Sequence, residues 1–156
     1  MAKKIKYLVI HCTATPEYMP ISSDMIRAWH LNNNGWRQVG YSGMIHLNGY
    51  YETLVPFDDD DFIAPWEITN GVRGINAVSR HIVYVGGCQK SNPKKAKDTR
   101  TPAQYKKLAE FVKEQTKAHP HIQIAGHNQF SNKACPSFDV PAFCREIGLA
   151  EKNIYQ

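Results

Sequence analysis

Two histidines and a cysteine stand out in this chain because their side chains could bind one metal ion together. His11 ends the apolar run Tyr7 to Ile10, and small polar residues follow it. His127 follows a second short apolar run, and Cys135 comes eight residues after it. Two imidazoles and a thiolate make a zinc set that leaves a fourth position open for water, as catalytic zinc sites do. These residue types therefore allow zinc-assisted hydrolysis.

The spacing of these residues is not that of a zinc finger or ribbon, because the chain has no C-x₂-C pair. Seven histidines occur in the chain, and a single histidine more often serves in the core or on the surface than as a ligand. Residue types alone leave both interpretations open.

Five segments of the chain resemble, in order, the zinc-dependent N-acetylmuramoyl-L-alanine amidase family, which includes lysozymes of the phage T7 type and peptidoglycan recognition proteins. The segments span roughly residues 5–145 and read VIHCTAT, IRAWHLNNNGWRQVGYS, GINAVSRHIVYVGG, TPAQYKKLAEFV and AGHNQFSNKACPSFD. The last is the most specific, since it joins a histidine to a Lys-x-Cys-Pro-x-Phe-Asp ending. The resemblance implies one zinc ion per chain, with His11, His127 and Cys135 as its ligands.

The resemblance also assigns roles to residues that are not ligands. Lys133 matches the family's catalytic lysine, and its positive charge could stabilise a developing oxyanion. Tyr41 matches the catalytic tyrosine, whose phenol could orient water or transfer a proton, although packing in a hairpin is the alternative. Asn76 matches an asparagine of the substrate groove, where an amide both donates and accepts hydrogen bonds. His30 matches a frequent family position, but its place on a helix face favours support of the core over metal binding.

Three departures from the family pattern leave the hydrolytic centre intact but affect the substrate site. Ser42 and Gly71 stand where many relatives carry histidine. The segment from Gly49 to Asn76 is longer than in the phage relative and contains four consecutive aspartates, residues 58–61. These lack the alternation of an EF-hand and indicate a solvated loop rather than a calcium site. Trp36 and Trp66 could line a groove, but core packing is the interpretation we favour for each.

The elements that must position these side chains alternate between strands and helices. Residues 5–11, 80–85 and 122–125 are expected as buried strands, and residues 41–54 as a hairpin that turns at Asn48-Gly49. Helices are expected from residue 22 to about 34, after Thr101-Pro102-Ala103-Gln104, and over 139–148, while residues 55–77 look irregular. The pattern predicts one α/β domain over residues 1–156, with a central mixed sheet flanked by helices. We expect His11 and His127 just past strand ends, where α/β sheets place their sites.

Bulk properties limit the functional classes. The chain has 156 residues, enough for one domain, and no apolar run approaches a membrane span. Its net charge of +5 is spread along the sequence, and the one cluster, residues 90–100, lacks interleaved aromatics, so we expect no nucleic-acid partner. We expect no signal peptide, synthesis in the cytoplasm and action on the cell wall after release. Cys135 is assigned to the metal site, and the other three cysteines, Cys12, Cys88 and Cys144, are expected as buried free thiols.

The sequence thus predicts a monomeric zinc amidase that cuts peptidoglycan between N-acetylmuramic acid and L-alanine, similar to a phage or prophage endolysin. The alternative is a peptidoglycan-binding recognition module without catalysis. Relatives of that kind typically lack the ligand cysteine, whereas Cys135 is present here with Tyr41 and Lys133. A further regulatory activity is a third possibility, for which no residue argues.

Overall fold

A five-stranded mixed sheet forms the centre of the molecule in the computed structural model, which describes residues 1–156. Its strand order is β5-β4-β7-β2-β9, with the bounds Tyr51–Thr53, Gly43–Ile45, Ser79–Tyr84, Tyr7–Cys12 and Gln123–Gly126. Strand β2 is parallel to both of its neighbours, and β4 is parallel to β7. Only β5 is antiparallel, because it is joined to β4 by the predicted Asn48-Gly49 turn, with Gly49 at φ +87°. The expected mixed sheet is confirmed.

Two short strand pairs lie outside this sheet and were not expected from the sequence. Strand β1 (Lys3–Lys4) pairs antiparallel with β6 (Phe62–Ile63), and β3 (Thr15–Pro16) pairs parallel with β8 (Gly87–Cys88). The segment 55–77 is therefore not wholly irregular, since it also contains the 3-10 helix Pro65–Glu67 and the start of a second, Asn76–Val78.

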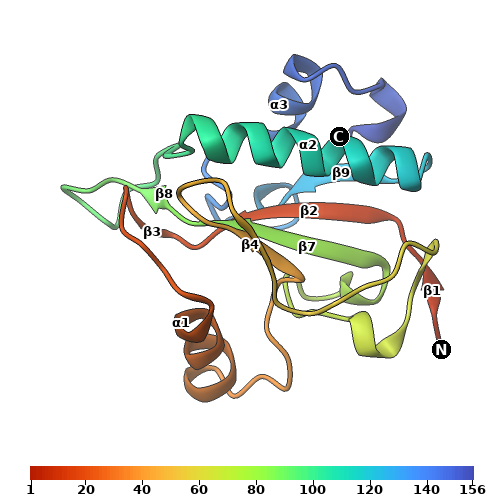
Figure 1. The fold of residues 1–156 in the computed structure, drawn as a ribbon, viewed down its shortest axis with the longest axis horizontal. Coiled ribbons are helices and arrows are strands. Elements are labelled where there is room, and N and C mark those ends of the chain that lie inside the picture. The colour runs from red at the N-terminus through yellow and green to blue at the C-terminus, as the bar shows by residue number, and fades with distance from the viewer.

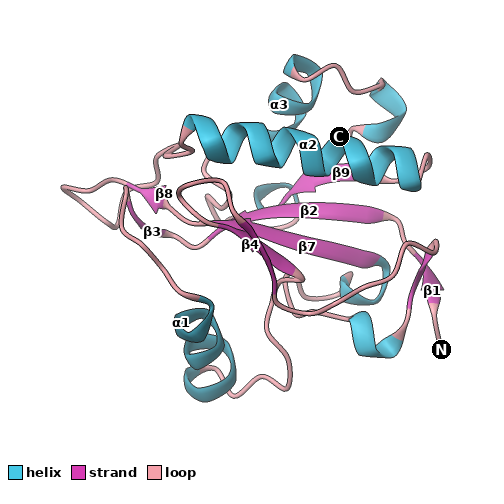
Figure 2. Cartoon of the chain, viewed as in Figure 1, coloured by secondary structure: helices cyan, strands magenta, loops and turns pink.

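Figure 2 shows the helices. They begin at the positions that the sequence predicts. The Ser22 side chain caps α1 (Ser23–Arg27), which continues as a π-helix over Ala28–Asn33. Thr101 and Gln104 form a capping box at the start of α2 (Pro102–Ala118). Asp139 caps α3 (Val140–Glu146), and 3-10 helices cover His127–Gln129 and Glu151–Asn153.

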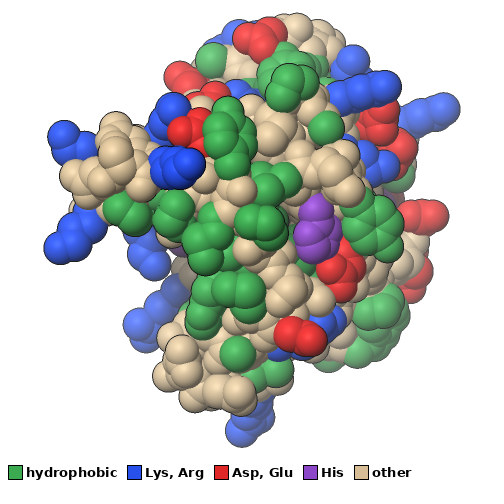
Figure 3. All heavy atoms as spheres, turned by 60° about the vertical axis from the view of Figure 1, so that its left-hand side comes forward, with side chains coloured by type: hydrophobic (Ala, Val, Ile, Leu, Met, Phe, Trp, Pro, Cys, Tyr) green, Lys and Arg blue, Asp and Glu red, His purple; other side chains and the backbone are tan.

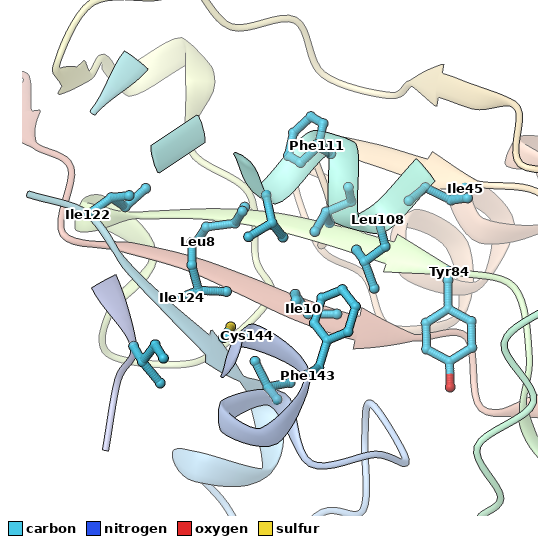
Figure 4. Packing of buried hydrophobic residues seen from close by; sticks show 14 of the residues in the cluster. Leu8, Ile10, Ile45, Tyr84, Leu108, Phe111, Ile122, Ile124, Phe143 and Cys144 are labelled. Atoms are coloured by element: carbon cyan, nitrogen blue, oxygen red, sulfur yellow. The ribbon is translucent and has the colours of Figure 1, made fainter. Parts of the chain in front are cut away.

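Helices α2 and α3 lie on one side of the sheet, and α1 lies apart from them (Figure 1). The larger core fills the space between the sheet and these two helices, where Leu8 and Ile10 of β2 meet Leu108, Phe111 and Phe143 (Figure 4). A smaller cluster packs α1 against the sheet and includes Ile21, Ile26, Val39, Met44 and Val83. Because side chains alternate along a strand, β2 gives Leu8 and Ile10 to one core and turns His11 to the opposite face.

The cysteines, the surface charge and the length of the helices also bear on the expectations from the sequence. All four cysteines are free. On the face drawn in Figure 3, basic side chains occur at several separate places and not in one continuous patch. None of the helices combines the length and apolarity that a membrane crossing requires.

The expected core packing of Trp36 and Trp66 is wrong. Trp36 is 37% exposed, and its ring lies against His30 with a centroid distance of 4.6 Å. Trp66 is 57% exposed, because the short helix Pro65–Glu67 that carries it lies at the surface.

The aspartate-rich segment, residues 58–61, makes hydrogen bonds within its own loop and to His119. Asp58, Asp59 and Asp60 are exposed, as expected for a solvated loop. The buried Glu67 carboxylate lies near Asp58 and Asp60, but it accepts hydrogen bonds from the backbone N–H groups of Asp58 and Ala64. Asp61 contacts Nδ1 of His119, the residue directly after α2, at 2.7 Å.

Candidate metal centre

His11, His127 and Cys135 come together at one place in the fold. Their candidate ligand atoms all lie within 4.8 Å of one another. His11 lies inside β2 rather than past its end, because the pairing with β7 continues to Cys12 and Tyr84. His127 directly follows the neighbouring strand β9, as expected, and Cys135 lies on the loop before α3. Two adjacent strands and one loop thus form the cluster.

The distances within the cluster place the three donors around one point. Nδ1 of His11 lies 3.8 Å from Sγ of Cys135, and the rings of His11 and His127 have a centroid distance of 4.8 Å. The backbone N–H of Cys12 donates to Sγ of Cys135 over 3.2 Å. This hydrogen bond holds the sulfur beside β2.

The electrostatics of the cluster keep both imidazoles neutral. Burial, followed by the neighbouring His81 and His127, lowers the pKa of His11 well below its usual value. Burial and the ammonium of Lys133 lower the pKa of His127. Neutral imidazoles have a free lone pair, which metal binding needs. The Cys12 thiol and burial raise the pKa of Cys135, so its thiolate needs a cation beside it.

This donor set fits zinc. Zinc–nitrogen distances of about 2.0–2.1 Å and a zinc–sulfur distance of about 2.3 Å place tetrahedral donors roughly 3–4 Å apart. The 3.8 Å between Nδ1 of His11 and Sγ of Cys135 falls in that range. Two nitrogens and one sulfur are ligands that zinc accepts, and three ligands leave a fourth position for water.

The loop that carries Cys135 is fastened to the sheet by side-chain hydrogen bonds. The Tyr84 hydroxyl donates to the carbonyl of Pro136 over 2.7 Å, and the Ser137 hydroxyl donates to the carbonyl of Gly87 over 2.8 Å. Tyr84 is fully buried. These two bonds hold the residues directly after Cys135 and so restrict where its sulfur can lie.

Tyr41 lies beside the cluster. Its ring centroid is 5.1 Å from that of His11. Burial, followed by the nearby Cys135 and Cys12, raises the pKa of the phenol, which therefore stays protonated at neutral pH and can donate a hydrogen bond. His30 supports this segment, since its Nδ1 accepts from the backbone N–H of Gly40 over 2.9 Å. His30 is outside the ligand cluster, in keeping with its expected supporting role.

A groove of about 690 Å³ lies beside the cluster, with His127 in its wall. His127 and Lys133 line it together with Trp36, which agrees with the groove-wall interpretation of that residue; Trp66 is not part of it. Its wall holds three cations and no carboxylate; the lining residues are Trp36, Arg37, Asn70, Gly71, Val72, Arg73, Gly74, Asn76, His127, Phe130, Ser131 and Lys133. The groove is therefore electropositive.

Asn76 lines the groove as expected, but part of its amide is engaged within the protein. Its Oδ1 accepts from the backbone N–H of Val72 over 2.9 Å and lies 2.9 Å from Nε2 of His81. Only the NH₂ group of Asn76 is left to face a substrate.

His81 is a neighbour of the cluster that the sequence reasoning missed. Its side chain is fully buried, and its Nδ1 lies 2.9 Å from Nε2 of His11. Burial and the neighbouring His127 lower its pKa to about 3. The available signal was a histidine directly before the apolar run Ile82-Val83-Tyr84-Val85.

The sequence of the chain is similar to those of known amidases and phage endolysins. The family model described as N-acetylmuramoyl-L-alanine amidase matches residues 1–138. The endolysin of Enterobacteria phage K11 is 33% identical over 132 residues, which cover 84% of this chain and 80% of the relative.

Solved structures show the same α/β fold. The Ph2119 endolysin from the Thermus scotoductus MAT2119 bacteriophage Ph2119 has a TM-score of 0.70 at 24% identity, and the match covers 96% of this chain and 88% of that one. The N-acetylmuramoyl-L-alanine amidase LysC from Clostridium intestinale URNW has a TM-score of 0.72 at 17% identity, with coverage of 96% and 91%.

Proposed function

The chain belongs to the N-acetylmuramoyl-L-alanine amidase family, and we propose that it performs this amide hydrolysis on peptidoglycan with one zinc ion, as a phage or prophage endolysin. The observation that carries the proposal is the convergence of His11, His127 and Cys135 beside an electropositive groove that His127 lines. The metal-binding cysteine favours catalysis over recognition alone.

Each residue of the proposed centre has a separate task. His11, His127 and Cys135 would hold the zinc ion, which when bound acidifies water and polarises a carbonyl. Lys133 stabilises negative charge on the carbonyl oxygen, because its ammonium lines the groove next to His127. The protonated Tyr41 phenol donates a hydrogen bond that orients the attacking water or the scissile amide.

The groove fits a peptide that carries carboxylates. Arg37, Arg73 and Lys133 line it, and no acidic side chain offsets their charge. The stem peptide of peptidoglycan is anionic, so these cations favour its binding and its approach. The NH₂ group of Asn76 supplies a donor for a peptide carbonyl. We propose that the protein acts as a monomer on the cell wall after release.

Metal analysis and product analysis together test this proposal. The purified protein should contain about one zinc per chain, and it should release new amino termini of L-alanine, without new reducing sugar ends, from purified peptidoglycan. His11→Ala and Cys135→Ala should lose both zinc and hydrolysis. His46→Ala is the matched control, because His46 lies outside the cluster and contacts Glu52 instead.

The possible outcomes separate the candidate functions. New reducing ends without alanine amines would show that the bond assignment is wrong. Tight binding of wall fragments without any product would favour the recognition module. Full zinc content and normal activity in both ligand variants would refute the proposed ligand set.

A further inference from the structure

His81 and His11 project from the same face of two neighbouring strands. In the parallel register of β2 and β7, His81 is opposite Val9, two residues before His11. Because side chains two residues apart on a strand share a face, the two imidazoles are diagonal neighbours. Nε2 of His11 and Nδ1 of His81 lie 2.9 Å apart, and both side chains are buried. The sheet itself therefore imposes this contact.

The direction of this hydrogen bond follows from the backbone. The N–H of Val72 donates to Oδ1 of Asn76, so that atom is an acceptor, and Nε2 of His81 must donate to it. A neutral imidazole carries one N–H, so Nδ1 of His81 accepts the bond from Nε2–H of His11. Nδ1 of His11 then has its lone pair free, 3.8 Å from Sγ of Cys135.

We propose that His81 is a positioning residue, which orients the His11 imidazole and presents its Nδ1 to the zinc ion, and that Asn76 sets the tautomer of His81. The inference rests on the proposed function, in which His11 is a ligand. A ligand histidine ordinarily donates its second ring N–H to an acceptor, and losing that acceptor costs about 10–100-fold in metal affinity or activity. Asn76 therefore acts on the metal centre as well as on the groove.

Gly71 provides the space that His81 occupies. A methyl group on Gly71 would overlap Cγ, Nδ1 and Cε1 of the His81 ring. The backbone of Gly71 is not in the left-handed region, so the ring is the obstacle to a side chain there. Gly71→Ala should consequently displace His81 and weaken zinc binding without a change in any ligand.

Two substitutions at position 81 separate the acceptor from the bulk of the ring. In His81→Asn, the amide Oδ1 takes the place of Nδ1 and can still accept from His11. In His81→Phe, a ring of similar size remains without an acceptor. Both variants lose the imidazole Nε2–H donated to Asn76, so their comparison isolates the hydrogen bond to His11.

The experiment measures the zinc dissociation constant by competition with a chelating indicator. It also reads the tautomer of His11 in the metal-free proteins from imidazole ¹⁵N shifts. We expect His81→Phe to bind zinc about 10–100-fold more weakly than the parent and to lose the uniform Nε2–H tautomer of His11. We expect His81→Asn to stay within about threefold of the parent, well short of the loss that follows removal of the acceptor.

The results distinguish this inference from the proposed function. A parent that binds zinc, together with a His81→Phe variant that binds it equally well and keeps the Nε2–H tautomer, overturns the positioning role alone. Equal losses in His81→Phe and His81→Asn, with His11 unchanged in tautomer, also overturn it, because packing would then explain both. A parent that takes up no zinc overturns the proposed function and this inference with it.

Discussion

Removing the hydroxyl of Tyr84 should destabilise the protein, because its hydrogen bond is buried and has no substitute. The hydroxyl donates to the carbonyl of Pro136 over 2.7 Å, and Tyr84 is fully buried. In Tyr84→Phe the ring still packs, but the carbonyl of the buried Pro136 loses this partner. An unsatisfied buried polar group costs about 1–3 kcal/mol. In a chain of this size, that corresponds to a decrease in Tm of about 2–12 °C.

Thermal unfolding of metal-free protein, followed by circular dichroism, measures this effect without any contribution from zinc. Tyr50→Phe is the matched control, since Tyr50 is 62% exposed, and its free energy of unfolding should change by less than about 0.5 kcal/mol. If Tyr84→Phe unfolds within about 1 °C of Tyr50→Phe, less than the smallest expected loss, the Pro136 carbonyl is satisfied in another way and the reasoning fails. Because Pro136 directly follows Cys135, the destabilised variant should also bind zinc more weakly than the parent.

Three further predictions concern the site and the long loop. Lys133→Ala should keep its zinc but lose about 10²–10³ in kcat; turnover within about twofold of the parent would exclude an oxyanion role. Tyr41→Phe should likewise retain zinc while its kcat falls by about 10²-fold or more. An unchanged rate of hydrolysis in single-turnover assays on one muropeptide would exclude a catalytic role of the phenol. The hydrogen bond to His119 holds the pKa of Asp61 below its usual value. This contact therefore stabilises the folded state fully above the unfolded-state pKa of about 3.9, and the stabilisation is lost as the pH falls through the lower folded-state pKa. Asp61→Asn should therefore be less stable than the parent at pH 7 in urea titrations, and the two should converge as the pH falls below the folded-state pKa of Asp61. A difference that persists at the lowest pH would assign the effect to packing.

Local signals in the sequence predicted the parts of the fold that depend on neighbours in the chain. The Thr101 and Gln104 capping box, the Asn48-Gly49 turn and the strand before His127 all occur where expected. Short strands such as β1 and β6 were not predicted, because each has two residues and exists only through its partner. Their pairing is a tertiary property, and no periodicity can appear in two residues.

In the candidate site too, the sequence predicted the residues that belong to a local motif and missed one whose role depends on a tertiary contact. The motif around Cys135 indicated the candidate ligands, which the structure brings together. His81 was missed because its contact with His11 depends on the register of two strands 70 residues apart. Gly71 appeared in the sequence as the loss of a histidine common in relatives. In the structure, an imidazole from β7 occupies the space beside Gly71, so the departure at position 71 and the histidine at position 81 belong together.

The order of the strands determines when, during synthesis of the chain, the candidate metal centre can form. His11 and Cys135 are 124 residues apart in the chain, yet they meet because β2, near the start, lies between β7 and β9. Contacts over such separations form against the entropy of closing a long loop. A nascent chain that ends before Cys135 has at most two of the three candidate ligands. The growing polypeptide therefore lacks the complete set of candidate ligands until Cys135, which follows the last strand β9, has been made.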